Sequence, residues 1–384
     1  MLTHLPKPTP DPIFAIAAEA RKAGAEGINA TIGMVMDEEG NTLVLPSVAK
    51  AANIVSHELK GRSFGYGHLL GLPEFREGVH TLILGDHAVP LASIATTGGT
   101  GAVAVNLRLL KKMHDDITVI LPSPAWANHL PLLKATPVQS LEVPYFADGL
   151  PTIEGIAEGL KKVKGPVAVL LQVGCHNPTG LDFTIDQWKE LAPILATHQC
   201  AALLDLAYQG FSSTVEEDAE PLHIVRGSGI TTLVSWSASK NHSLYSERTG
   251  LAAAFVPDEE TKMTVEGHYS SITRGIHSAA ATLGQSIVAA VQKQFKKEWL
   301  QDIADVRVIL TAKRKALIEA LPKKFEISLK GHGMFAMLPI SEENIIRLKN
   351  EEKVFMLHDG RINIAGIPLL RMQELGERIR KVEG

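Results

Sequence analysis

The sequence has little of what several classes of protein require. Cysteine occurs only twice in 384 residues, as Cys175 and Cys200, which is too few for a disulfide framework and shows no metal-ligand spacing. No segment approaches eighteen uninterrupted apolar residues, and the N-terminal residues carry no basic region followed by an apolar stretch. We therefore expect a cytoplasmic location, no membrane partner and no metal site.

A strong charge of one sign is also missing. The formal net charge is −4 at pH 7, which gives no long-range attraction for polyanions and argues against a nucleic-acid partner. Aromatic residues make up only 5%, but 45% apolar and 21% charged residues are typical of an ordinary globular protein. Small molecules are therefore the expected ligands. Because 384 residues exceed what one hydrophobic core usually serves, we expect two domains.

Short apolar runs alternate with helical patterns, as a largely parallel α/β sheet requires. Six runs are expected to be strands: residues 91–97, 117–123, 167–173, 201–207, 231–237 and 250–256. A glycine-rich stretch leads into an amphipathic helix over residues 98–113. Thr184 and Gln187 form a capping-box pattern at the start of another helix, which Pro193 is expected to kink or end.

The C-terminal part of the sequence reads as a separate α+β unit. It is expected to start with a long helix over residues 299–320 and to continue with four strands and two helices. The strands are expected at residues 324–329, 334–339, 354–357 and 361–365. We expect a large domain over residues 43–295, and a small domain from residues 1–42 together with 296–384.

Unusual residues follow several of the expected strands, where open parallel sheets bind their ligands. They are Gly98 to Gly101 after residues 91–97, "GCHNPTG" after 167–173, Asp205 and Tyr208 near the end of 201–207, and Lys240 after 231–237. Each has a plain alternative. The glycines and "NPTG" are good turn sequences, Lys240 could be solvated, and Asp205 could form a structural salt bridge.

Taken together, these residues meet the needs of one cofactor. Pyridoxal phosphate requires a lysine for the Schiff base, a carboxylate opposite the pyridine nitrogen, and a phosphate cup. Lys240 and Asp205 would supply the first two. The helix N-terminus at Gly99 and Thr100 would offer backbone N–H groups and the positive end of a helix dipole to the phosphate. Two further residues could complete the cup: Ser237 and Arg248.

Eight stretches, in order along the chain, carry a resemblance to a known family. They are "TIGMVMDEEGNT" (31–42), "YGHLLGLPEFR" (66–76), "TTGGTGAV" (96–103), "SPAWANH" (123–129), "CHNPTGLD" (175–182), "DLAYQGF" (205–211), "SWSASKNHSLYSERTG" (235–250) and "GRINIAG" (360–366). In order and approximate spacing they resemble the class I aminotransferases of fold type I, most closely the aspartate and aromatic branch. The resemblance implies a homodimer with active sites at the subunit interface.

The resemblance also implies a role for each candidate residue. Lys240 would form the Schiff base and move a proton between the substrate's α-carbon and the cofactor, while Asp205 would keep the pyridine nitrogen protonated. Tyr208 and Asn177 would hydrogen-bond the phenolic oxygen, and Trp126 would stack on the ring. The phosphate ligands would be Gly99, Thr100, Ser237, Arg248 and, from the neighbouring subunit, Tyr66. The substrate-binding residues would be Arg361, Arg274, Gly33, Asn177 and Trp126. His129 and His176 would support Asp205.

Two departures from the family pattern concern the substrate and the cofactor. Arg361 would clamp the α-carboxylate, and Arg274 of the partner subunit would bind a distal carboxylate. However, Ala279 to Ala281 replace the Asn-Pro-Pro that usually follows the family's serine. Gln172 stands where the aspartate branch tends to carry a histidine behind the buried aspartate. The preferred amino acid therefore stays open between aspartate, an aromatic amino acid and others.

The sequence thus predicts a pyridoxal-phosphate-dependent aminotransferase. It would work in ping-pong order through pyridoxamine phosphate, passing the amino group of an L-amino acid to a 2-oxo acid such as 2-oxoglutarate. Two alternatives remain. One is a pyridoxal-phosphate-dependent lyase or decarboxylase, since the cofactor makes the carbanion and the protein selects the bond that breaks. The other is a non-catalytic cofactor-binding protein of the same fold.

Overall fold

The computed structural model describes residues 12–58 and 65–383 and divides into two compact units. The large unit comprises residues 43–177 and 181–308, and the small unit comprises residues 1–42, 178–180 and 309–384. Residues 1–11 of the expected small domain lie outside the described residues.

The boundary near the C-terminal side differs from the expected one. It falls at residues 308/309, within the long helix α11 (Lys296–Ala320), and not before that helix. The reason lies in what each half of α11 packs against. The Trp299 indole N–H donates to the Asn241 carbonyl of the large unit at 2.7 Å, whereas Leu317 belongs to the hydrophobic core of the small unit. One continuous helix therefore contributes to two cores.

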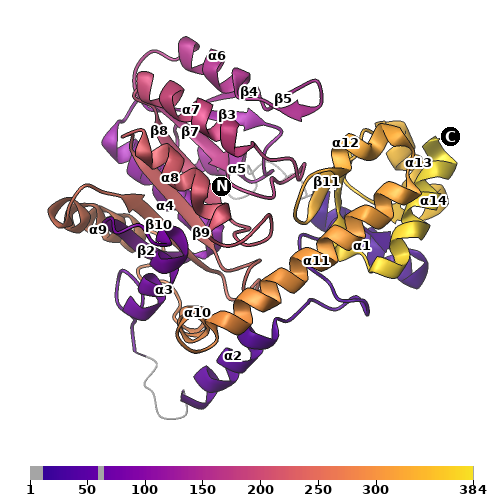
Figure 1. Ribbon diagram of the computed structural model, residues 1–384, viewed down its shortest axis with the longest axis horizontal. Helices are drawn as coiled ribbons and strands as arrows, with labels where there is room; N and C mark the ends of the chain where they lie inside the picture. Colours follow the sequence, from indigo (N-terminus) through magenta and orange to yellow (C-terminus); the bar gives the residue numbers. More distant parts are fainter. Residues whose placement is uncertain (1–11, 59–64, 384) are drawn as a thin grey trace, which may run out of the picture. The chain divides into compact units, whose positions relative to one another are not determined.

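A seven-stranded sheet lies at the centre of the described large unit, in the order β2-β10-β9-β8-β7-β3-β4 (Figure 1). The strands are β2 (Leu91–Thr97), β3 (Thr118–Ser123), β4 (Gln139–Pro144), β7 (Val167–Gln172), β8 (Ala201–Leu206), β9 (Thr232–Ser237) and β10 (Thr249–Phe255). All neighbouring pairs are parallel except those of β10, which runs antiparallel to β2 and β9. This confirms the mostly parallel α/β architecture. The sequence missed β4, whose largely exposed residues form no apolar run.

Helices cover the sheet, with α4 packed against β9 and β10 and α9 packed against β2. The helices that lie wholly in this unit are α2 (Pro46–Glu58), α3 (Pro73–Leu84), α4 (Gly98–Met113), α5 (His129–Ala135), α6 (Glu154–Lys162), α7 (Ile185–Thr197), α8 (Glu220–Gly227), α9 (Glu259–Arg274) and α10 (Leu283–Gln294). A two-stranded pair, β5 (Phe146–Ala147) and β6 (Leu150–Pro151), completes the unit's described strands.

The predicted capping box at the start of α7 is confirmed, because the Thr184 and Gln187 side chains each accept from the other residue's backbone N–H. Pro193 does not end this helix, which runs on to Thr197. Pro193 lies on the exposed face of α7, as does Lys189, whose carbonyl loses its helical donor there. Water can solvate that carbonyl, so the helix continues.

The small unit is α+β, as expected. β1 (Ile28–Asn29) pairs in parallel with β12 (Val354–Phe355), and β11 (Phe335–Met337) pairs antiparallel with β13 (Arg361–Asn363). Its further elements are α1 (Pro12–Lys22), α12 (Glu326–Leu329), α13 (Glu342–Glu352) and α14 (Met372–Glu383). No helix of residues 12–58 and 65–383 is long and apolar enough to cross a membrane.

The strand expected at residues 324–329 is wrong, because this segment forms a 3-10 turn followed by α12. The alternation of Phe325, Ile327 and Leu329 suggested a strand with one buried face. In the structure Phe325 and Leu329 are buried while Ile327 is 46% exposed. Burial four residues apart is the helical pattern, and Ile327 falls on the other side.

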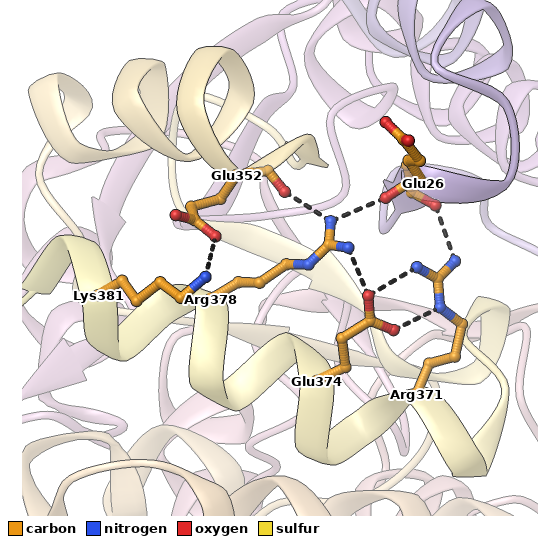
Figure 2. Close-up of polar contacts among 7 residues, drawn as sticks. Glu26, Glu352, Arg371, Glu374, Arg378 and Lys381 are labelled. Atoms are coloured by element: carbon orange, nitrogen blue, oxygen red, sulfur yellow. Dashed lines mark hydrogen bonds and ion pairs between the residues drawn. The ribbon is translucent and has the colours of Figure 1, made fainter.

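Two arginines in or next to α14 form hydrogen bonds with the segment around Glu26 and Gly27, as Figure 2 shows. Arg378 donates to the carbonyls of Glu26 and Glu352 at 2.8 and 2.6 Å, and Arg371 donates to the Gly27 carbonyl at 2.9 Å. Both guanidinium groups also bind the Glu374 carboxylate, and the hydrogen bond from Arg371 is the main cause of that carboxyl group's lowered pKa. The N-terminal and C-terminal segments of the unit are thus held together by charge-assisted hydrogen bonds.

Candidate active site

The sheet register brings the candidate residues of the large unit to one edge. Gln172 of β7, Asp205 of β8 and Ser235 of β9 are aligned across their strands. Ser237 at the end of β9 faces Gly250 of the antiparallel β10, which in turn faces Thr96 near the end of β2. The carboxyl ends of β2, β7, β8 and β9 therefore lie along the same edge. The candidate residues that follow these strands are therefore found at this edge.

The first part of the site is a cup at the start of α4. The Thr97 side chain makes no capping hydrogen bond there, so the helix begins without a side-chain acceptor for its first N–H groups. A Cβ atom placed on Gly98 would lie 2.6 Å from Arg248 Nη2, and one placed on Gly99 would lie 3.0 Å from the Ser237 Cβ. Glycine backbone, guanidinium and hydroxyl groups thus surround one small space.

Ser239 is a cup residue that the sequence analysis missed. Arg248 Nη1 donates to the Ser239 hydroxyl at 3.2 Å, and the Ser237 hydroxyl lies 3.1 Å from it. The signal was present in the sequence as "SAS" directly before Lys240, with two hydroxyl residues at alternate positions. The turn after β9 links the two hydroxyls to each other and the Ser239 hydroxyl to Arg248.

Lys240 is influenced by two groups of opposite charge, Arg248 and Asp205. Burial of its amine, followed by the positive charge of Arg248, lowers the pKa of Lys240 from 10.5 to about 8, while Asp205 opposes the shift. Its Nζ atom is 4.9 Å from the centroid of the Tyr245 ring. An amine with this lowered pKa loses its proton nearer to neutral pH than an ordinary lysine amine does. A neutral amine is the nucleophilic form.

Asp205 is buried, with a relative exposure of 3%, and has the partner that a buried carboxylate needs. His129 donates from Nε2 to Asp205 Oδ2 at 3.0 Å. The Trp126 ring stands edge-on to the His129 ring, with centroids 5.2 Å apart. His176 takes a different position, stacked on Tyr145 at 4.2 Å, and burial lowers the pKa of His176 to about 3, so that it is neutral.

Asn177 lies in the turn after β7 and contacts Tyr208. The Asn177 side-chain amide donates to the Tyr208 hydroxyl at 3.5 Å, and both side chains are buried. Asn177 N–H donates to the Gln172 side-chain oxygen at 3.2 Å. The two predicted hydrogen-bonding residues are therefore neighbours in the structure.

The remaining candidates occupy other places. Gly33 and Arg361 belong to the small unit, where the buried Arg361 donates to the Thr31 carbonyl at 3.2 Å and lies 5.1 Å from the Phe335 ring centroid. Tyr66 and Arg274 are exposed on the large unit, Arg274 as the last residue of α9.

The residues present fit pyridoxal phosphate. The cup combines an uncapped helix N-terminus, an arginine and two hydroxyls, which is the donor set that a phosphate needs. The buried Asp205 carboxylate and the half-buried Lys240, whose amine has a lowered pKa, lie at the same sheet edge. In contrast, the described ranges contain no group of three or more His, Cys, Asp or Glu residues that could hold a metal ion.

Comparison with known proteins decides the family. A family model described as aminotransferase class I and II matches residues 25–379. The chain belongs to this family. The aminotransferase is therefore an enzyme that transfers amino groups of amino acids with pyridoxal phosphate, as the sequence predicted.

Relatives of the aminotransferase cover nearly its whole length. It is 33% identical to an aromatic-amino-acid aminotransferase of Paracoccus denitrificans and 31% identical to an aspartate aminotransferase of Escherichia coli, in each case over 96% of both chains. A solved aromatic amino acid aminotransferase with 3-indolebutyric acid superimposes with a TM-score of 0.94 at 32% identity, over 100% of both chains. Relatives with both substrate names thus match about equally.

Proposed function

We propose that Lys240, Asp205, Tyr208 and the cup at α4 form the cofactor site, and that the enzyme transaminates aspartate or an aromatic amino acid with 2-oxoglutarate. The observation that carries the assignment is the position of Lys240. Burial and the positive charge of Arg248 lower the pKa of its amine to about 8. The negative charge of Asp205 acts in the opposite direction and limits this shift. No other residue of the edge combines nucleophilic chemistry with this electrostatic setting in the described part of the chain.

Bound pyridoxal phosphate would supply an electron-withdrawing ring that stabilises negative charge at the substrate's α-carbon. Gly99, Thr100, Ser237 and Arg248 would hold its phosphate. Asp205, fixed by His129, would keep a proton on the pyridine nitrogen, because a carboxylate beside the ring favours its cationic form. Trp126 would stack on the ring.

The protein's own proton-transfer group would be Lys240. An amine with a pKa near the working pH can both accept and release a proton, which is the requirement for moving one at the α-carbon. Asn177 and Tyr208 would donate hydrogen bonds to the phenolic oxygen and so stabilise its negative charge. The small unit would bind the substrate's α-carboxylate through Arg361, with Gly33 near the substrate.

A homodimer with shared sites would complete this assignment. Tyr66 would reach the phosphate, and Arg274 the distal carboxylate, of the neighbouring subunit's site. Both side chains are exposed in the single chain, as residues that act on a second copy would be. An arginine at this position would favour a dicarboxylic substrate by a charge-assisted hydrogen bond. The cytoplasmic location stays a prediction.

The test is an absorbance titration of the cofactor-loaded protein with single amino acids, without any keto acid. Conversion of the cofactor's absorbance by the wild type, and none by Lys240→Ala, is the expected result. An Arg274→Leu variant should lose conversion by aspartate and glutamate while it keeps conversion by aromatic amino acids. If Lys240→Ala converts the cofactor as the wild type does, the assignment of Lys240 fails. If Arg274→Leu treats aspartate as the wild type does, only the role of Arg274 fails.

A further inference from the structure

Gln172 is the residue of the site edge that the family pattern does not explain. It ends β7 and is aligned with Asp205 on the neighbouring β8. A polar side chain at this position could support the buried carboxylate directly. The structure shows another arrangement, because within the described residues the Asp205 carboxylate is hydrogen-bonded to His129 and both hydrogen bonds of the Gln172 amide go elsewhere.

The Gln172 amide holds the turn that follows its own strand. Its Nε2 donates to the Cys175 carbonyl at 3.2 Å, and its Oε1 accepts from Asn177 N–H at 3.2 Å. Both functions of the amide are thus used on one turn. An amide that bridges a carbonyl and an N–H two residues apart fixes the orientation of the peptides between them.

The turn needs such support because its backbone is in an unfavourable conformation. Cys175 has φ = 51°, in the left-handed region that a residue with a side chain seldom adopts. On the other side of the turn, the Asp182 carboxylate accepts from the N–H groups of Cys175 and His176, each at 2.8 Å. Gln172 and Asp182 therefore hold the turn from two sides.

What the turn presents is the side chain of Asn177. Its amide lies 3.5 Å from the Tyr208 hydroxyl, which is longer than the usual distance of about 2.7–3.2 Å for such a hydrogen bond. A small displacement of the Asn177 backbone would therefore break this contact. The orientation of Asn177 depends on a backbone N–H that Gln172 holds.

We propose that Gln172 is a positioning residue for Asn177, so that it acts on the phenolic-oxygen side of the cofactor and not on the Asp205 side. This inference rests on the proposed function, in which Asn177 and Tyr208 donate to the phenolic oxygen. A donor at that oxygen stabilises its anionic form and lowers the pH at which the neighbouring proton on the cofactor is lost. Loss of the Gln172 hydrogen bonds should move that transition to higher pH.

The experiment follows the absorbance of the bound cofactor against pH in four proteins: the wild type, Gln172→Met, Asn177→Ala and the double variant. We expect Gln172→Met to raise the midpoint by about half a pH unit or more, as the loss of roughly one hydrogen bond implies. In the Asn177→Ala background the same change should have no further effect, because residues that act through one another are not additive. In the cofactor-free protein, amide hydrogen exchange of residues 175–177 should be faster in Gln172→Met.

Gln187 offers a matched control in the same unit. It is also half-buried, and its amide likewise accepts from a backbone N–H, that of Thr184, and donates to a carbonyl, that of Pro151. Gln187→Met should leave the midpoint unchanged. An equal shift in Gln187→Met, an unchanged midpoint in Gln172→Met, or full additivity with Asn177→Ala would each overturn the inference.

A second variant covers the case in which Gln172→Met does not fold. Gln172→Asn keeps the amide but shortens its reach by one methylene, and it should raise the midpoint in the same direction. An unchanged midpoint in that variant would also overturn the inference. These outcomes are distinct from failure of the proposed function, which would appear as a wild-type protein whose absorbance shows no bound cofactor.

Discussion

Gly250 packs directly against the backbone of the cup. It lies in β10 next to the start of α4, and a Cβ atom placed on it would lie 2.5 Å from the Gly98 carbonyl carbon, 2.6 Å from its oxygen and 2.9 Å from its Cα. Real Cβ atoms keep at least 3.0 Å from their neighbours, and here the neighbour is backbone and not a flexible side chain. Gly250→Ala must therefore displace either β10 or the first residue of α4 by several tenths of an ångström.

We expect two measurable effects. Such overpacking typically costs about 1–3 kcal/mol, so Gly250→Ala should lower the thermal midpoint of the protein. A displaced helix start should also weaken phosphate binding, so the dissociation constant of pyridoxal phosphate should rise about tenfold, which corresponds to ~1.4 kcal/mol. Fluorescence titration of the cofactor-free protein and a thermal melt measure the two quantities.

Gly267→Ala provides the control with the opposite sign. Gly267 lies in the exposed face of α9 and has nothing within 4 Å of an added Cβ. Since alanine is the better helix former by roughly 1 kcal/mol, this variant should be slightly more stable and should bind the cofactor as the wild type does. If Gly250→Ala matches the wild type in both quantities, the close contact between β10 and α4 does not limit the cup, and the reasoning fails.

Two further predictions concern stability. Folding lowers the pKa of Lys240 from 10.5 to about 8, so between these pH values the unfolded chain binds more protons than the folded protein. The folded protein is therefore destabilised by its charged lysine, fully below pH 8 and no longer above pH 10.5. Lys240→Met should therefore raise the thermal midpoint of the cofactor-free protein at pH 7, with a gain that shrinks toward pH 10.5; a gain independent of pH would contradict this reasoning. Ser93→Ala should cost about 1–3 kcal/mol in chemical denaturation, because the buried hydroxyl accepts from Arg76 Nε at 2.9 Å and pairs with His80 at 2.7 Å. A loss below ~0.5 kcal/mol would show that water replaces the hydroxyl.

The sequence predicted the sheet well because its strands are buried on both faces. Runs such as residues 201–207 contain enough apolar residues to be recognised without alternation, and β8 spans Ala201–Leu206. The edge strand β4 was missed because its residues are mostly exposed and form no apolar run. At residues 324–329, a period of two in the sequence competed with burial four residues apart, and tertiary packing decided in favour of a helix.

The site was predictable where its residues follow strands, and not where they depend on packing. Asp205 and Lys240 could be found from the rule that ligands meet the carboxyl ends of parallel strands. Ser239 needed the geometry of one turn, and the support of Asn241 by Trp299 joins residues 58 positions apart that no local pattern connects. The double hydrogen bond of Gln172 likewise depends on the left-handed conformation of Cys175, which is not a usual choice for cysteine.

The pairing of β1 with β12 has a consequence for the order in which the protein can be made. Arg361 donates to the Thr31 carbonyl across 330 positions of the chain, and Ala30 N–H donates to the Phe355 carbonyl beside it. Because synthesis adds about 5–20 residues per second, Arg361 is made on the order of 15–60 seconds after Thr31. The large unit's sheet is complete by Phe255, so it can form while β1 is still unpaired. The segment around Ile28 therefore has no strand partner until Val354 and Phe355 have been synthesised.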